Sequence, residues 1–528
     1  MNAAIQLYDT TLRDGAQGQG VSLSVNDKLL IARRLDQLGV AMIEGGWPGS
    51  NPKDIEFFQA AARHPWQKAR VAAFGSTRRV GVRAEGDEQV RLLIDAATPI
   101  VTIFGKTWTL HIEEVLRTTR AENLAMISDT VRHLVANGRE VVYDAEHFFD
   151  GCKADSAYAL DCVAAASEAG AATVVLCDTN GGTLPREIAL MTAQVLSRVR
   201  CRVGIHTHDD SGLGVANALA AIESGATHVQ GTMNGFGERT GNCNLTTLIP
   251  ILQLKMGLPV VSDAELAHLR EVSLFIDDVA NQNSNPRAPF VGAYAFAHKG
   301  GMHVNAVNKV AASYEHIPPQ LVGNSQHILV GELSGRTNVF MKARDLGISL
   351  DEKAPETRDI LETIKGMEAA GYEFESADAS FELLVRKALQ HHRPFFETLE
   401  YRVSVRHSVE RRYEVSEATV KLRVRDAESY TVADGDGPVN ALDQALRKAL
   451  RQFHPSLDEV RLTDYKVRII DSTSGTEART RVLISSTDGR STWNTVGVSD
   501  NILDASWLAL AESIEFFLLR REMGPKTA

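Results

Sequence analysis

The stretch ATVVLCDTN at residues 172–180 is a near-continuous apolar run that ends in polar side chains, and RVGIHTHDD at 202–210 repeats the pattern. Runs of this kind with few polar interruptions are typical of strands in a parallel sheet that is covered on both faces. The sequence contains six more of them: IQLYDT (from 5), AMIEGG (41), VAAFGS (71), IVTIFGK (100), EVVYDAEH (140) and THVQGTMNG (227). We therefore expect eight short strands in the first half of the chain.

Amphipathic helical segments lie between these runs. In SVNDKLLIARRLDQLG (24–39), apolar residues recur every three or four positions, Ser24 can serve as the N-cap, and Gly39 follows the helix end. Eight strand–helix units in about 250 residues predict an α/β fold of the (β/α)8 TIM-barrel type. An open doubly wound sheet is the alternative, but the first strand is not followed by the glycine-rich dinucleotide turn.

Length and composition limit the possible functions. The chain has 528 residues and a net charge of −11, which predicts more than one domain and disfavours binding to nucleic acid or an anionic membrane surface. Its five cysteines have no CxxC spacing, and no stretch approaches the roughly 18 apolar residues of a membrane span. We expect a cytoplasmic protein whose partners are small molecules.

The pattern changes after the barrel, and the sequence predicts three domains: a barrel at 1–258, small helical linker subdomains at 259–400 and a C-terminal α+β domain at 401–528. The last domain contains a weak repeat, ATVKLRVRDAESYTVADGDGPVNALDQALRKAL (418–450) and RTRVLISSTDGRSTWNTVGVSDNILDASWLALAESI (479–514). Each copy reads strand, turn, strand, loop, helix. A duplicated ββα unit predicts a compact accessory domain with pseudo-twofold symmetry, and a homodimer is the default expectation.

The HTHDD segment is the sharpest chemical signal. Residues two apart on a strand point to the same face, so His206 and His208 project together and suit a divalent metal; hydrogen bonding to neighbours is the alternative. Asp14 and Asn242 follow the first and eighth strands and complete a set that leaves coordination positions open. A 2-oxo acid could chelate such a metal, and Arg13 could stabilise the alkoxide formed from its ketone.

Three segments resemble one enzyme family: DTTLRDGAQ (9–17), HTHDDSGLGVAN (206–217) and GFGERTGNCNL (235–245). They are similar to the acyl-CoA condensing, metal-dependent barrel enzymes that include isopropylmalate, homocitrate and citramalate synthases, with hydroxymethylglutaryl-CoA lyase as a more distant relative. The C-terminal GPVNALDQALRKAL and TVGVSDNILDASWLAL resemble the regulatory domain of these synthases. EGGWPGSNPKD, YDAEHFFDG, FAHKGGMHVNAV and YEHIPPQLVGN are most similar to the citramalate synthases of the group.

This resemblance implies condensation of acetyl-CoA with pyruvate, followed by thioester hydrolysis. Asp14, His206, His208 and Asn242 would bind the divalent metal (Mn²⁺, Mg²⁺ or Zn²⁺), with Arg13 and Asp14 also contacting the substrate. Further implied roles are catalysis by Glu146, binding of the substrate carboxylate by Thr179, a pocket wall at Tyr143, and proton abstraction by His303 with Tyr314 beside it. A branched amino acid such as isoleucine would act on the C-terminal domain.

Other interpretations remain open at this point. The same chemistry could act on a bulkier 2-oxo acid, as in isopropylmalate or homocitrate synthesis, although Tyr143 and Phe104 near the barrel mouth would favour pyruvate. Glu146 could simply pair with a lysine or arginine of the barrel. An inactive metal-binding or amino-acid-sensing protein is a third hypothesis, which the complete set of site residues disfavours.

Overall fold

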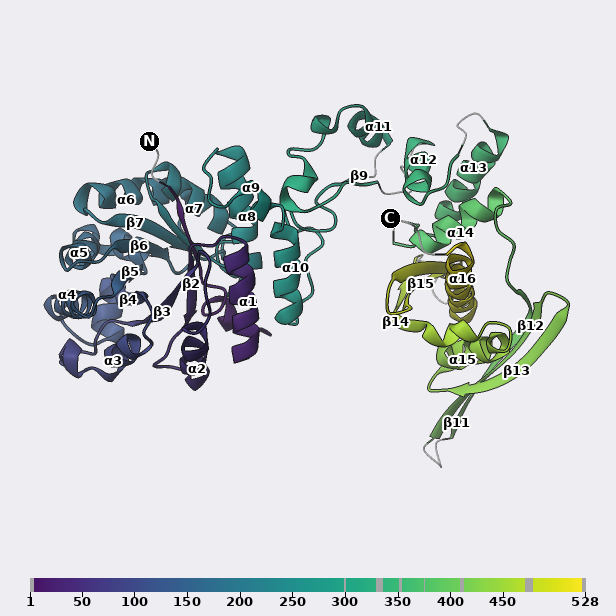
Figure 1. Ribbon diagram of the computed structural model, residues 1–528, viewed down its shortest axis with the longest axis horizontal. Coiled ribbons are helices and arrows are strands. Elements are labelled where there is room, and N and C mark those ends of the chain that lie inside the picture. Colours follow the sequence, from purple (N-terminus) through teal and green to yellow (C-terminus); the bar gives the residue numbers. More distant parts are fainter. Residues whose placement is uncertain are drawn as a thin grey trace. The chain divides into compact units, whose positions relative to one another are not determined.

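The computed structural model (Figure 1) describes residues 4–298, 301–328, 336–350, 354–374, 376–408, 413–470 and 478–524. It divides into two compact units, the first comprising Met1–Phe296 with Glu315–Gln326, and the second Ala297–Tyr314 with His327–Ala528. Among the described residues, no helix is long and apolar enough to cross a membrane.

The first unit is built on a closed parallel barrel whose strands follow one another in chain order. The strands are β1 (Gln6–Asp9), β2 (Met42–Gly46), β3 (Arg70–Ser76), β4 (Ile100–Lys106), β5 (Glu140–Glu146), β6 (Thr173–Asp178), β7 (Arg202–Thr207) and β8 (His228–Gly231). Each corresponds to one of the apolar runs in the sequence, so the predicted eight-stranded TIM barrel is confirmed.

Helices cover the outside of the barrel (Figure 1). They are α1 (Val25–Gln37), α2 (Pro52–Ala61), α3 (Glu88–Asp95), α4 (Arg120–Ala136), α5 (Phe148–Glu168), α6 (Pro185–Arg198), α7 (Gly214–Glu223) and α8 (Leu245–Pro250). Ser24 is the N-cap of helix α1, as expected. Its side chain accepts from the N–H of Asp27, and the Asp27 side chain accepts from the N–H of Ser24, which together form a capping box.

Side chains alternate along each barrel strand between the helical shell and the barrel interior. On β5, Val141, Tyr143 and Ala145 belong to the large core between barrel and helices, whereas Val142 belongs to a separate inner cluster. The inner cluster consists of Tyr8, Met42, Ala72, Ile100, Val142, Val175 and Cys177. Inward positions nearer the strands' carboxyl ends carry polar residues such as Asp144, and these form the site described below.

The first unit extends beyond the boundary expected at residue 258. Helix α10 (Leu269–Val279) buries Leu269, Val272 and Ile276 in the same core as the barrel helices, and it contacts α1. This apolar face makes α10 part of the barrel unit rather than of a linker.

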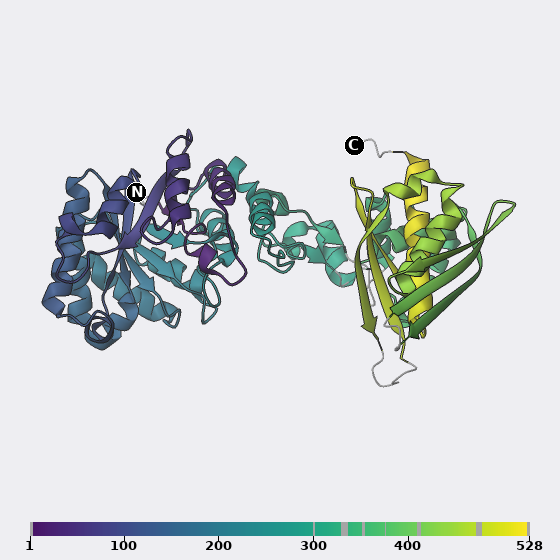
Figure 2. The same cartoon turned by 90° about the horizontal axis from the view of Figure 1, so that it is seen from below.

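The second unit contains the expected duplication (Figure 2). Strands β11 (Glu397–Ser408), β12 (Tyr413–Val424) and β13 (Ala427–Gly435) form one antiparallel sheet and precede α15 (Pro438–Arg451). Strands β14 (Arg461–Ile469), β15 (Thr480–Thr487) and β16 (Thr492–Ser499) form the other and precede α16 (Ile502–Met523). The predicted ββα units are present, and each has one further strand before it.

Helix α14 (Asp378–Ala388) is attached to α16 by buried polar contacts. Ser380 Oγ donates to Glu512, and Glu515 accepts from Lys387 Nζ (2.8 Å) and contacts His392 Nε2 at 3.0 Å. Burial raises the pKa of Glu512 to about 7, with the Ser380 hydrogen bond acting in the opposite direction. The ionised form of this carboxyl is therefore costly in the folded protein.

Glu512→Gln should stabilise the second unit more at pH 8 than at pH 5. The folded-state pKa of Glu512 lies above its unfolded value, so the wild-type chain loses stability as pH rises from about 4.5 through 7, by on the order of 3 kcal/mol. Glutamine keeps an acceptor for Ser380 and has no charge to bury. Calorimetric melting at both pH values measures the effect, with Glu522→Gln on the exposed end of α16 as control. An equal gain at both pH values would contradict the prediction.

Gly231→Ala should destabilise the barrel. A Cβ at this position would lie 2.5 Å from the carbonyl oxygen of Cys243 and 2.9 Å from Leu245 Cδ2. The expected cost is about 1–3 kcal/mol because the backbone carrying Cys243 must move. Gly366→Ala is the matched control: it is an exposed helix position with nothing within 4 Å of the added Cβ, and it should gain about 0.5–1 kcal/mol. Scanning calorimetry that leaves the barrel transition of Gly231→Ala unshifted would contradict this.

Candidate metal centre

A turn after β1 directs Arg13 and Asp14 toward the barrel mouth. The Asp9 carboxylate accepts from the backbone N–H (2.9 Å) and the hydroxyl (2.8 Å) of Thr11, which tightens the chain just past the strand. The backbone N–H groups of Arg13 and Asp14 then both donate to the carbonyl of Thr10, at 3.2 and 2.9 Å. The sequence DTTLRD thus forms a compact turn rather than an extended loop.

His206 and His208 reach the same place from the end of β7. Their rings lie 5.2 Å apart and their Nε2 atoms 3.4 Å apart, on one side of the strand as the alternation predicts. The intervening Thr207 points away and donates its hydroxyl to the carbonyl of Gly214 (2.7 Å).

Asn242 enters from the loop that follows β8. The loop pairs with the end of β7, because Cys243 N donates to the carbonyl of Thr207 (2.8 Å) and Asp209 N donates to that of Gly241 (2.9 Å). Gly241 adopts a φ of +96°, which a residue with a side chain rarely tolerates. The backbone therefore fixes the place of Asn242.

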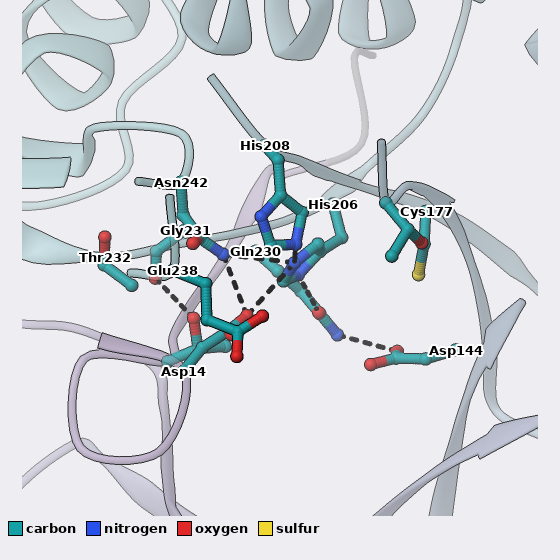
Figure 3. Close-up of polar contacts among 12 residues, drawn as sticks. Asp14, Asp144, Cys177, His206, His208, Gln230, Gly231, Thr232, Glu238 and Asn242 are labelled. Carbon is teal, nitrogen blue, oxygen red and sulfur yellow. Dashed lines mark hydrogen bonds and ion pairs between the residues drawn. The ribbon is translucent and has the colours of Figure 1, made fainter. Parts of the chain in front are cut away.

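These residues form one buried cluster (Figure 3). Ligand atoms of Asp14, His206 and His208 all lie within 4.8 Å of one another, and Asp14 Oδ2 is 3.2 Å from His206 Nε2. Asn242 Nδ2 donates to Asp14 Oδ2 (2.8 Å), while Asn242 Oδ1 has no hydrogen-bond partner among the described residues. Two imidazoles, a carboxylate and an amide oxygen fit a divalent metal with positions left for a substrate.

The charge states of Asp14 and His208 suit metal binding. Burial acts to raise the pKa of Asp14, but Arg13 and then His206 hold it well below its usual range. Burial, followed by the neighbouring His206, lowers the pKa of His208 to about 3. Asp14 is therefore ionised and His208 neutral near pH 7, the forms that ligate metals.

Arg13 is held in place by groups inside the barrel rather than by solvent-exposed partners. Its Nε donates to Glu44 Oε1 (2.6 Å), its guanidinium carbon lies 3.7 Å from the centroid of the Phe74 ring, and its Nη1 is 3.3 Å from Asp14 Oδ1. Glu44 also accepts from the Tyr8 hydroxyl (2.7 Å). The sequence places Glu44 at a strand end, but its pairing with Arg13 could be seen only in the fold.

Two residues behind His206 were missed by the sequence analysis. His206 Nδ1 is 2.8 Å from Gln230 Oε1, and Gln230 Nε2 donates to Asp144 Oδ1 (3.0 Å). Both lie at inward positions of their strands. Burial, then the nearby Glu44, raises the pKa of Asp144 to about 7. The two-residue spacing between Asp144 and Glu146 is the signal that could have identified Asp144.

Glu146 and Thr179 lie at the ends of neighbouring strands. Glu146 forms an ion pair with Lys106 of β4, the contact weighed as the alternative to a catalytic role. Thr179 Oγ1 accepts the backbone N–H of His147 (2.9 Å), which leaves its hydroxyl proton for another acceptor. Neither contact tests the roles predicted for these residues.

The expectation that Tyr143 lines the barrel mouth is not met. Its side chain is fully buried in the core between the barrel and the helices, and a Cβ on Gly105 would meet its ring. The reason is the alternation along β5, which turns residue 143 outward and residues 142 and 144 inward. Phe104, by contrast, lies on the inner side of β4 and stacks on Phe74 at 5.6 Å.

His303 and Tyr314 belong to the second unit. Helix α11 (Gly301–Lys309) carries His303, whose ring stacks on that of Tyr314 with centroids 4.3 Å apart and planes 28° from parallel. Both side chains are exposed. The structure thus brings together the two residues that the resemblance paired.

Comparison with known proteins agrees with this architecture. Residues 4–276 match the HMGL-like family model, 290–371 the homocitrate synthase post-HMGL domain-like model and 375–518 the LeuA allosteric (dimerisation) domain. The chain is 51% identical to the (R)-citramalate synthase of Synechocystis sp., over 98% of this chain and 96% of the relative. The chain belongs to the citramalate synthase family.

Two further relatives show that the chain is more similar to a citramalate synthase than to a protein named as an isopropylmalate synthase. The (R)-citramalate synthase of Geobacter sulfurreducens is 50% identical over 98% of each chain. A protein named probable 2-isopropylmalate synthase, from Methanopyrus kandleri, is only 31% identical over 98% of this chain and 99% of its own.

Asp14→Asn should lower the bound metal content of this citramalate synthase family member to a small fraction of wild type. The substitution keeps the shape of the side chain but removes the only carboxylate within the group of Asp14, His206 and His208. Elemental analysis after equilibration with Mn²⁺ and gel filtration measures it. His268→Ala, which removes an exposed imidazole from the same unit, should retain the wild-type content. Undiminished metal in Asp14→Asn would exclude this site.

Proposed function

We propose that the protein is an (R)-citramalate synthase that condenses acetyl-CoA with pyruvate and hydrolyses the thioester, releasing citramalate and CoA on a route to isoleucine. The observation that carries the proposal is the full-length similarity to (R)-citramalate synthases, which exceeds the similarity to an isopropylmalate synthase over the same span. The site agrees with it, because a cluster that fits a divalent metal lies beside the largely buried side chain of Arg13.

The metal proposed for the site is a divalent cation, Mn²⁺, Mg²⁺ or Zn²⁺, held by Asp14, His206, His208 and Asn242. When bound, it supplies Lewis-acid polarisation of a ketone. Asn242 would contribute its Oδ1, which has no hydrogen-bond partner among the described residues. With these four ligands, coordination positions remain for the carboxylate and ketone oxygens of a 2-oxo acid.

Arg13 stabilises the oxygen that gains negative charge. Glu44 occupies its Nε and Phe74 lies against one face, so the guanidinium cannot turn away from the mouth. Its remaining N–H groups are preorganised donors for the developing alkoxide, and preorganised donors of this kind typically contribute about 3–4 kcal/mol.

Carbon–carbon bond formation needs a base for the acetyl methyl group. We assign this to His303, with Tyr314 stacked against it, and give Glu146 the accompanying acid–base role. The Thr179 hydroxyl, which accepts from His147 N, donates to the carboxylate of pyruvate. The carbanion equivalent attacks the ketone carbon, and water then cleaves the thioester and makes the reaction irreversible.

Regulation and assembly follow from the second unit. The match to the LeuA allosteric (dimerisation) domain supports a homodimer with an amino-acid effector site, and isoleucine, the end product, is the effector we propose. Inhibition of CoA release by isoleucine but not by lysine tests this. The cysteines are free thiols, which suits action in a reducing cytoplasm.

Thiol release from acetyl-CoA should be fastest with pyruvate and at least ten times slower with 2-oxoisovalerate. Phe104 stacks on Phe74 on the inner side of the barrel, and we propose that this pair of rings limits the space for a branched substituent. A thiol reagent follows CoA release with each 2-oxo acid, with and without chelator. Equal rates with both acids would overturn the substrate assignment, and rates unaffected by chelator would overturn the metal requirement.

A further inference from the structure

A chain of buried hydrogen bonds lies behind His206 (Figure 3). Gln230, on β8, is fully buried and contacts His206 Nδ1 through Oε1 at 2.8 Å. Its Nε2 donates to Oδ1 of Asp144, on β5, at 3.0 Å, and Asp144 is 4% exposed. The three side chains come from three strands, and only closure of the barrel brings them into line.

The chemistry of the side chains determines which group donates in each hydrogen bond of this series. Oδ1 of Asp144 accepts a hydrogen bond from Gln230 Nε2, so the Gln230 amide presents its NH₂ group to Asp144. Its oxygen then faces His206 and requires a proton on Nδ1. The Nε2 atom of a neutral His206 then keeps its lone pair on the side of the cluster, 3.2 Å from Asn242 Nδ2 and 3.2 Å from Asp14 Oδ2.

We propose that Asp144 and Gln230 are positioning residues that hold His206 in the tautomer competent to bind metal. This rests on the metal requirement of the proposed function. His208 lacks an equivalent support, because its Nδ1 has no hydrogen-bond partner among the described residues. His206 is therefore the imidazole whose ring angle and tautomer the fold determines, and outer hydrogen bonds of this kind are typically worth about 10–100-fold in metal affinity.

Gln230→Met is the direct test, since methionine keeps the shape of glutamine and makes neither hydrogen bond. The Kd for Co²⁺, measured by calorimetric titration of the full-length protein, should rise about 10–100-fold, and the visible absorption spectrum of the bound Co²⁺ should change. Thr102→Val is the matched control. It removes the buried hydrogen bond between Thr102 and Tyr8 in the barrel interior and leaves the hydrogen bonds of Asp144, Gln230 and His206 in place. The Kd of the control should stay within about twofold of wild type.

An exchange of the two polar groups separates positioning from packing. In Gln230→Glu combined with Asp144→Asn, the new carboxylate accepts from His206 Nδ1 and the new amide donates to it, so the direction is preserved. This isosteric pair should bind Co²⁺ within about threefold of wild type, and it provides the test even if Gln230→Met does not fold. A loss above tenfold in the pair, or unchanged affinity in a folded Gln230→Met, would overturn the proposal. A wild-type protein that binds no Co²⁺ would instead refute the metal site itself.

Discussion

The closed barrel brings residues from the two ends of the first unit's sequence into contact. Asp14 follows β1 and His206 lies on β7, yet their side chains meet at 3.2 Å because β1 pairs with β8 and β8 with β7. An open sheet with the same strands would hold these residues on separate edges. The proposed metal site depends on this contact, because neither residue alone would bind a divalent ion tightly.

Closure of the barrel concentrates negative charge from several carboxylates in a buried space. The guanidinium of Arg13 offsets most of this charge. Asp14, Glu44 and Asp144 are nearly inaccessible to solvent, and the proximity of Glu44 adds to burial in raising the pKa of Asp144. Arg13 contacts the first two directly. Removing one partner of a buried ion pair typically costs about 3–5 kcal/mol, so Arg13 stabilises the empty site as well as serving the substrate. The neighbouring Arg13–Asp14 pair of the sequence is therefore a structural unit of the interior, not a surface ion pair.

The sequence was sufficient for features that depend on periodicity. Apolar runs located all eight strands, and the two-residue spacing of His206 and His208 placed both rings on one face. It failed where strand register decides: Tyr143 was expected at the mouth, whereas the alternation of β5 buries it outward and turns Asp144 inward. Pairings between neighbouring strands, such as Glu146 on β5 with Lys106 on β4, depend on strand register and rotamers that no local pattern encodes.

The supports of the four proposed ligands differ in a way that bears on function. Asp14 is fixed by the turn that Asp9 organises, Asn242 by backbone pairing of its loop with β7, and His206 by Gln230. His208 has only packing behind it within the part of the chain that the structure describes. If a substrate bound at the open coordination positions required a ligand to shift, the least restrained ligand would move at the smallest cost. The fold thus holds Asp14, His206 and Asn242 in place and leaves the His208 imidazole able to adjust. This arrangement can accommodate the proposed 2-oxo acid without disturbing Arg13.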